Sequence, residues 1–102
     1  MIRFEILLPL FHNDGRPVDP GDFVAADDEL QQCFKATSTE TVIVHGRWVY
    51  QSLTYSDQLI RVRVDVDDTP ENWEMIRQVK ESFKARFAQI DIWITAHHIE
   101  VV

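Results

Sequence analysis

The chain has 102 residues, a formal net charge of −7 and a single cysteine, Cys33. This length supports one hydrophobic core, so we expect a single domain over residues 1–102. The acidity disfavours nucleic acid and anionic membranes as partners, because both attract basic surfaces. One thiol forms no internal disulfide, and no apolar run is long enough to cross a membrane. Composition therefore favours a cytoplasmic, globular protein.

The first half of the chain predicts a strand, a helix and a second strand. Residues 2–11 alternate apolar and polar side chains, with Ile2, Phe4, Ile6 and Leu8 expected on the buried face. After turn-forming residues, Asp19-Pro20-Gly21-Asp22 predicts a helix start. Residues 41–50 form a β-branched and aromatic run, in which Trp48 and Tyr50 are expected on the buried face. Residues 51–56 are expected to be a polar link.

The segment 58–73 predicts a strand followed directly by a helix. Its apolar and charged side chains alternate with the period of two of a strand that has one buried face. The apolar positions are Ile60, Val62, Val64 and Val66. Thr69-Pro70 then offers a capping hydroxyl and a proline at the first helical position. Helical spacing of apolar residues continues to residue 89, and residues 90–102 predict the last strand.

The resulting order, β-α-β-β-α-β, predicts an α+β, ferredoxin-like fold. Two right-handed crossovers sharing one sheet give four antiparallel strands in the order 4-1-3-2, with both helices on one face. The other face is then open and requires an explanation.

Arginine side chains gather on the open face predicted from this alternation. The residues expected there as a ligand or dimer face are Arg3, Arg47, Arg61, Arg63, Trp93 and His97. One interpretation is a platform for a small acidic ligand or for a second copy, giving a homodimer. The favoured interpretation of the charges alone is a set of cross-strand ion pairs with Glu5 and Asp65.

A second candidate site lies at the sheet rim, where the first strand ends beside the start of the third. His12, Asp14, Tyr55 and Asp57 would meet there, which is enough chemistry for general acid–base catalysis. Plain turn chemistry explains the same residues and is the favoured interpretation.

We expect neither a metal nor a cofactor. Asp67 and Asp68 precede a helix N-terminus, where negative charge is stabilising without a cation. His97 and His98 are neighbours on a strand and point to opposite faces, so they are not a metal pair. Cys33 falls on an apolar helical stripe and is expected in the core.

Four segments carry a resemblance to a known family: FHNDGRP (residues 11–17), GRWVY (46–50), DQLIR (57–61) and KARFAQ (84–89). Together they resemble a family of small uncharacterised bacterial proteins of about this length. The resemblance implies a bacterial origin and no assigned activity. The chain departs from that pattern at residues 33–36, where related chains show a glycine-containing turn.

The leading functional hypothesis is a small binding or interaction module that self-associates through the open sheet face. The alternative is a small-molecule enzyme with a site at the sheet rim, as in dimeric α+β barrels, which the sequence resembles only at fold level. Whether it is an enzyme stays open. An RNA-binding sheet fits worst, because the open face lacks paired central aromatics that stack on bases.

Overall fold

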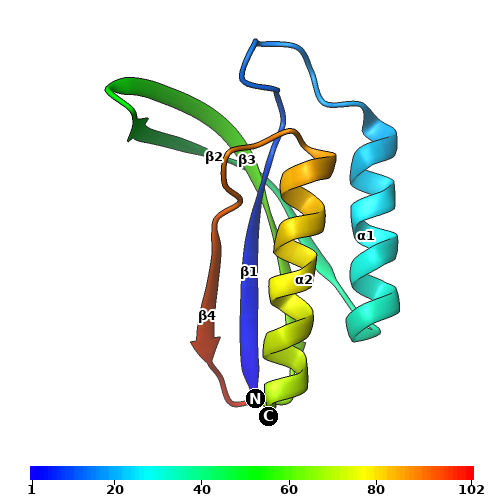
Figure 1. Cartoon of the computed structure of the whole chain (residues 1–102). Helices are drawn as coiled ribbons and strands as arrows, with labels where there is room; N and C mark the ends of the chain where they lie inside the picture. Colours follow the sequence, from blue (N-terminus) through cyan, green and yellow to red (C-terminus); the bar gives the residue numbers. More distant parts are fainter.

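Six elements follow one another in the computed structural model, which describes residues 1–102 apart from the side chain of Thr41. They are β1 (Ile2–Pro9), α1 (Pro20–Phe34), β2 (Ser38–Tyr50), β3 (Leu53–Val66), α2 (Pro70–Arg86) and β4 (Ile94–His98). The two helices lie side by side on one face of the sheet (Figure 1). The predicted α+β architecture, with two helices on an antiparallel sheet, is confirmed.

The sheet has the strand order β2-β3-β1-β4, and every neighbouring pair is antiparallel. β1 is central: Ile2 to Pro9 pair with Val66 to Leu59 of β3, and the other edge of β1 pairs with β4. Because paired residues share a face, this register fixes which side chains meet the helices and which do not.

The alternating apolar positions of the central strands form the core, as the sequence predicted. Ile2, Phe4, Ile6 and Leu8 of β1 are buried, and so are Val62, Val64 and Val66 of β3. The helices close this layer with Ala26, Leu30 and Phe34 from α1 and with Ile76, Val79 and Phe83 from α2. Cys33, expected in the core, packs against it and is only partly buried.

Both helices begin at the predicted caps. The side chain of Asp19 accepts a hydrogen bond from the backbone N–H of Gly21 at 2.8 Å. Thr69 Oγ1 accepts one from the backbone N–H of Asn72 at 3.2 Å. Each cap satisfies a donor that the first helical turn leaves without an intrahelical partner.

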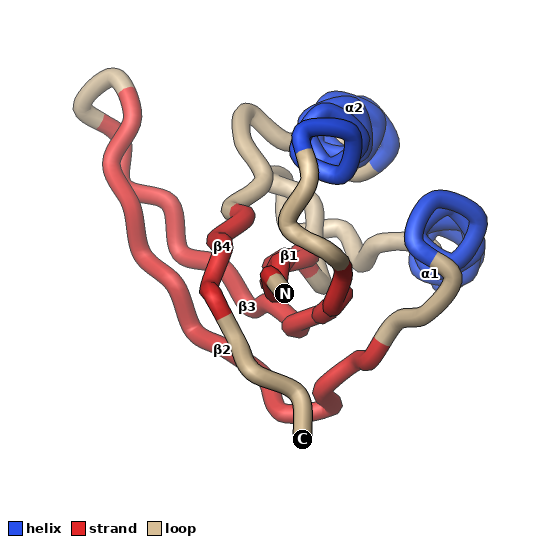
Figure 2. The backbone as a smooth tube through the Cα atoms, turned by 90° about the horizontal axis from the view of Figure 1, so that it is seen from below, coloured by secondary structure: helices blue, strands red, loops and turns tan.

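The hairpin of β2 and β3 is much longer than the sequence suggested. The link expected at 51–56 shrinks to a turn at Gln51 and Ser52, both with positive φ. This backbone is typical of tight two-residue hairpins, where asparagine and glycine are usual, so these two residues are a weak signal for it. β1 ends opposite Leu59, and beyond that point the hairpin projects from the sheet, away from the helices (Figures 1 and 2).

The face assignment predicted for β2 was wrong. Trp48 pairs with Tyr55, and Tyr50 with Leu53, on the same face of β3 as Arg61, which is the helix-free face. Arg47 pairs with Ser56 and belongs to the opposite face. The prediction rested on the parity that Trp48 and Tyr50 share with Val44, but Val44 pairs with Leu59 and is itself on the helix-free face.

The C-terminal elements are shorter than predicted. α2 ends at Arg86 instead of residue 89, and β4 covers Ile94–His98 instead of residues 90–102. Ala88 has a positive φ of 51°, so the chain turns sharply after the helix. Residues 89–93 therefore form a connecting segment beside the end of β1.

Candidate functional site

A ladder of ion pairs crosses the helix-free face of the sheet. Arg3 binds Asp65 through two nitrogens, with Nε 2.8 Å from Oδ1 and Nη2 3.0 Å from Oδ2. Arg63 Nε lies 3.0 Å from Glu5 Oε1. Arg61 lies 3.2 Å from Glu40 Oε2 and 3.5 Å from Glu5 Oε2. A further ion pair links Arg63 to Glu40.

These pairs leave little free positive charge on the face. The Arg3 guanidinium, mainly by its hydrogen bonds, holds the pKa of the Asp65 carboxyl below its usual value. The same hydrogen bonds raise the pKa of Arg3. His97 Nε2 lies 3.7 Å from Glu5 Oε2, at the edge of the network. Of the arginines expected to hold a small acidic ligand, Arg3, Arg61 and Arg63 are thus engaged by carboxylates of the chain itself, as the ion-pair interpretation predicted.

The rim candidates come together only in part. His12, Tyr55 and Asp57 line one open hollow of about 530 Å³. Asp14 belongs instead to its own loop: its carboxylate accepts hydrogen bonds from Arg16, through the side chain at 2.6 Å and through the backbone N–H at 3.0 Å. These bonds lower the pKa of Asp14. Asp14 therefore stabilises its own turn, as aspartate commonly does in turns.

His12 has no acid–base partner among the described side chains. Its Nδ1 is buried without a hydrogen bond, and no hydrogen bond joins the ring to Tyr55 or Asp57 within the part of the chain that is described. A general base needs a partner within hydrogen-bonding reach of the group it serves. The rim therefore lacks an assembled catalytic pair.

Asp57 is engaged on the hairpin, in a cluster that the sequence did not reveal. Its Oδ2 accepts a hydrogen bond of 2.5 Å from Trp48 Nε1. Tyr55 stacks on the Trp48 indole, with ring centroids 4.5 Å apart and an interplanar angle of 19°. Tyr50 lies on the same face, its centroid 6.4 Å from that of Trp48. The sequence signal for this cluster is that a two-residue turn at Gln51 and Ser52 pairs Trp48 with Tyr55 and places them on one face. That signal can be used only once the turn itself has been recognised.

The aromatic cluster forms one wall of a hollow of about 600 Å³ on the helix-free side. Leu7, Pro9 and Leu59 lie at its base, where β1 and β3 pair. The opposite wall is the connecting segment from Gln89 to Trp93. Most of the lining is apolar, and its ionisable side chains include Arg47, Asp57 and Asp91.

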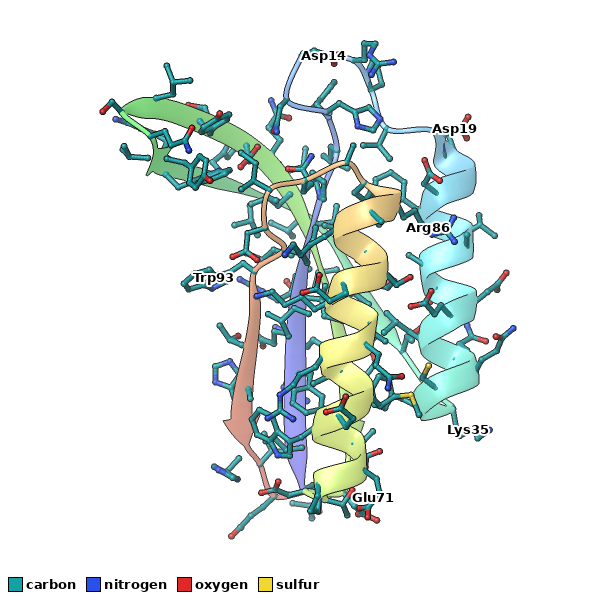
Figure 3. All side chains as sticks on the ribbon, viewed as in Figure 1. Asp14, Asp19, Lys35, Glu71, Arg86 and Trp93 are labelled. Atoms are coloured by element: carbon teal, nitrogen blue, oxygen red, sulfur yellow. The ribbon has the colours of Figure 1, made fainter. Side chains whose placement is uncertain are left out.

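Trp93 stands at the lip of this hollow. Its carbonyl oxygen accepts a hydrogen bond from the Leu7 N–H at 3.0 Å, which fixes the segment against β1. The side chain is 65% exposed and points away from the helices, on the side of the projecting hairpin (Figure 3). Asp91 beside it is anchored by Lys80 Nζ at 3.1 Å. Trp93 thus lies exposed on the helix-free side, where the alternation of the sequence placed it.

The hairpin also exposes large apolar side chains. Val49 is 69% exposed and Leu53 is 61% exposed. Val42, Ile43 and Tyr50 are exposed as well. Val49 and Leu53 lie on opposite faces of the ribbon, because Leu53 pairs with Tyr50 and Val49 with Thr54. We call Val42, Ile43, Val49, Tyr50 and Leu53 the hairpin patch.

The described side chains contain no group of three or more histidine, cysteine or carboxylate residues placed to hold a metal ion. Asp68, considered as a ligand, accepts a hydrogen bond from Trp73 Nε1 at 2.8 Å and lies 3.4 Å from His98 Nδ1. It sits beside the Thr69 cap at the start of α2, the setting that the sequence predicted.

Comparison with solved structures identifies several similar folds. A phage SAM lyase in complex with S-methyl-5′-thioadenosine matches 95% of this chain and 80% of its own, with a TM-score of 0.72 and 12% identity. The divalent cation tolerance protein CutA1 of Thermus thermophilus matches 100% and 87%, with a TM-score of 0.64 and 14% identity. The periplasmic CutA of Archaeoglobus fulgidus matches 100% of this chain and 87% of its own, with a TM-score of 0.63 and 13% identity. The likeness is one of fold.

No family model matches the chain, and no curated protein matches it. Within the described residues, no helix is both long and apolar enough to cross a membrane.

Proposed function

We propose that this chain is a small binding module that self-associates through its helix-free side, using the hairpin patch as the main contact. The observation that carries the proposal is the projecting hairpin, whose apolar side chains are exposed on both faces. Exposed apolar patches of this kind typically mark contact surfaces.

The physical reason is that no other strand or helix packs on the projecting part of the β2–β3 hairpin within the described residues. An isolated two-stranded hairpin is marginally stable in water, and its edges carry unpaired backbone groups. The Gln58 carbonyl accepts a hydrogen bond from the Leu10 N–H at 2.9 Å, and from there to the turn the edge of β3 has no partner from β1 within the described residues. A second copy packed on the ribbon would cover the apolar side chains and could pair with the free edge of β3. A homodimer is therefore the smallest assembly that covers the ribbon.

The ion-pair ladder favours association through the hairpin over association through the centre of the sheet. Its charges already satisfy one another, so covering them would gain little and would remove them from water. Apolar side chains gain from burial without such a cost. The contact on the helix-free side is therefore expected at Leu53 and the exposed Trp93, around the ladder instead of on it.

Similar folds support a binding role in general terms. The phage SAM lyase holds S-methyl-5′-thioadenosine, so a domain of this architecture accommodates a small ligand. The alternative, an enzyme with its site at the rim, rests on the hollow shared by His12, Tyr55 and Asp57. It is the weaker proposal, because Asp14 and Asp57 are engaged by Arg16 and Trp48. A cytoplasmic location accords with the free thiol of Cys33.

The test compares two apolar-to-charged changes of similar exposure. Leu53→Asp places a charge in the hairpin patch, whereas Val24→Asp places one on α1, where Val24 is 63% exposed. Light scattering over a concentration series should show a smaller mass for Leu53→Asp and an unchanged mass for Val24→Asp. Trp93→Glu should also weaken association.

Equal masses for Leu53→Asp and the parent protein would contradict the assignment of the hairpin patch. Equal loss in both Asp variants would point to a general effect of charge and would also count against it. Circular dichroism of each variant shows whether the fold is retained.

A further inference from the structure

We propose that the 600 Å³ hollow between the hairpin and the segment before β4 binds a small methylated ammonium ion. The inference rests on the binding role proposed above but not on self-association. Three features carry it: an aromatic wall, carboxylates at that wall and at the lip, and an apolar base.

The aromatic wall offers the surface that such cations prefer. Tyr55 covers one face of the Trp48 indole, and the indole still lines the hollow. Tyr50 stands beside it, and Trp93 belongs to the opposite wall. Methylated ammonium ions are held by the electron-rich faces of several aromatic rings, with tryptophan the strongest of them.

The hydrogen bond from Trp48 to Asp57 strengthens this wall. An N–H that donates to a carboxylate pushes electron density into the indole ring, and the Asp57 charge adds its own attraction for a cation. Asp91 on the facing segment also lines the hollow, and the charge of Lys80 offsets its own. Lys80 holds Asp91 by one oxygen, Oδ1, so the other carboxylate oxygen remains free to face a cation.

Charge also argues against an anion in the same place. The arginines of the ladder pair with Glu5, Glu40 and Asp65 and do not line the hollow. Arg47 does line it, but its cross-strand partner Ser56 places it on the other face of the ribbon from Trp48 and Asp57. On the ribbon face that carries Trp48 and Tyr50, the charged side chain that lines the hollow is Asp57.

The base of the hollow suits methyl groups. Leu7, Pro9 and Leu59 have apolar side chains with no acceptor for an ammonium hydrogen. A quaternary ammonium has no such hydrogen to satisfy, whereas a primary ammonium would leave its donors unpaired there. Methylation of the cation therefore fits the site better than a free amine does.

The experiment measures binding of choline and of its uncharged carbon isostere, 3,3-dimethylbutan-1-ol, by calorimetry and by the NMR signals of the tryptophan indole N–H groups. Choline is expected to bind about tenfold more tightly than the isostere, the ratio that one cation–aromatic contact supplies. The Trp48 N–H signal should shift, and that of Trp73 should not.

Two variants give a matched comparison, because each removes the charge of an aspartate that accepts an indole N–H. Asp57→Asn changes the acceptor of Trp48, and Asp68→Asn changes the acceptor of Trp73 on the helix side. Choline affinity should fall about tenfold in Asp57→Asn and stay unchanged in Asp68→Asn.

Equal affinity for choline and the isostere, no binding of either, or equal effects of the two variants would each overturn the proposal. Measuring Leu53→Asp in parallel separates the two claims. Choline binding retained in a monomeric Leu53→Asp protein shows a ligand site independent of assembly, whereas choline failing to bind an oligomeric parent protein refutes the ligand and leaves self-association intact.

Discussion

The pair of Arg3 and Asp65 shows at the scale of single residues how the helix-free face is neutralised. Two short hydrogen bonds join the side chains across β1 and β3. They hold the pKa of Asp65 below its usual value, so the charged carboxylate is favoured in the folded protein. In the unfolded chain that carboxyl titrates near its ordinary pKa of about 3.9.

The sign of the pH dependence follows from this difference. A carboxyl whose pKa is lowered by folding stabilises the folded state above its unfolded pKa and loses that contribution as the pH falls through the folded pKa. We expect Asp65→Asn to be less stable than the parent at pH 7, with the difference shrinking as the pH is lowered through the folded pKa of Asp65. Urea unfolding over a series of acidic pH values measures this.

Asp28→Asn is the control, because Asp28 is exposed and no ion pair with it occurs among the described side chains. A stability gap for Asp65→Asn that persists undiminished at the acidic end of the series would show that its effect does not arise from the charge.

Cys33 gives a second prediction at this scale. Burial, as the main cause, raises the pKa of its thiol. Since the thiolate is the reactive form, alkylation by iodoacetamide at mildly alkaline pH should be much slower in the folded protein than in urea. Equal rates in the two states would show that the thiol is not protected by the core.

Helix starts show what a single side chain contributes to an element. Thr69 caps α2 through Asn72, and removal of such a hydroxyl typically costs about 1 kcal/mol of the free energy of unfolding. Thr69→Ala should lose about that amount, whereas Thr69→Ser should lose little. Denaturant unfolding of the two variants measures the difference, and equal loss in both would argue against the hydroxyl as the stabilising group.

The elements with a clear period were predictable from the sequence. β1 and β3 alternate because one face is buried, and α2 starts at Pro70 because the capping hydroxyl of Thr69 stands directly before that proline. In these segments the local preference of the sequence agrees with the tertiary packing, so the pattern alone predicts the element.

The hairpin escaped prediction for a physical reason. Its turn at Gln51 and Ser52 lacks the glycine or asparagine that normally marks positive φ, so residues 51–56 looked like a loop. Without the turn, the pairing of Trp48 with Tyr55 could not be inferred. The alternation in β2 was visible, but which face was buried depended on how far the helices reach. Of the residues that line the hollow, the sequence therefore singled out only Arg47, Asp57 and Trp93.

At the scale of the molecule, one side of the sheet is covered by the helices and the other is exposed. The helices cover one side and complete the core, while the other carries a neutralised ladder, an aromatic hollow and the projecting ribbon. Much of the apolar surface that remains uncovered lies on the ribbon, so contact with a second copy is expected there.

The mass of the unmodified protein in solution tests that claim most directly. Sedimentation equilibrium over a range of micromolar concentrations should give at least twice the chain mass of 12.0 kDa. A mass of 12.0 kDa at every concentration would mean that the hairpin patch is stable in water without a second copy, and would contradict self-association through it.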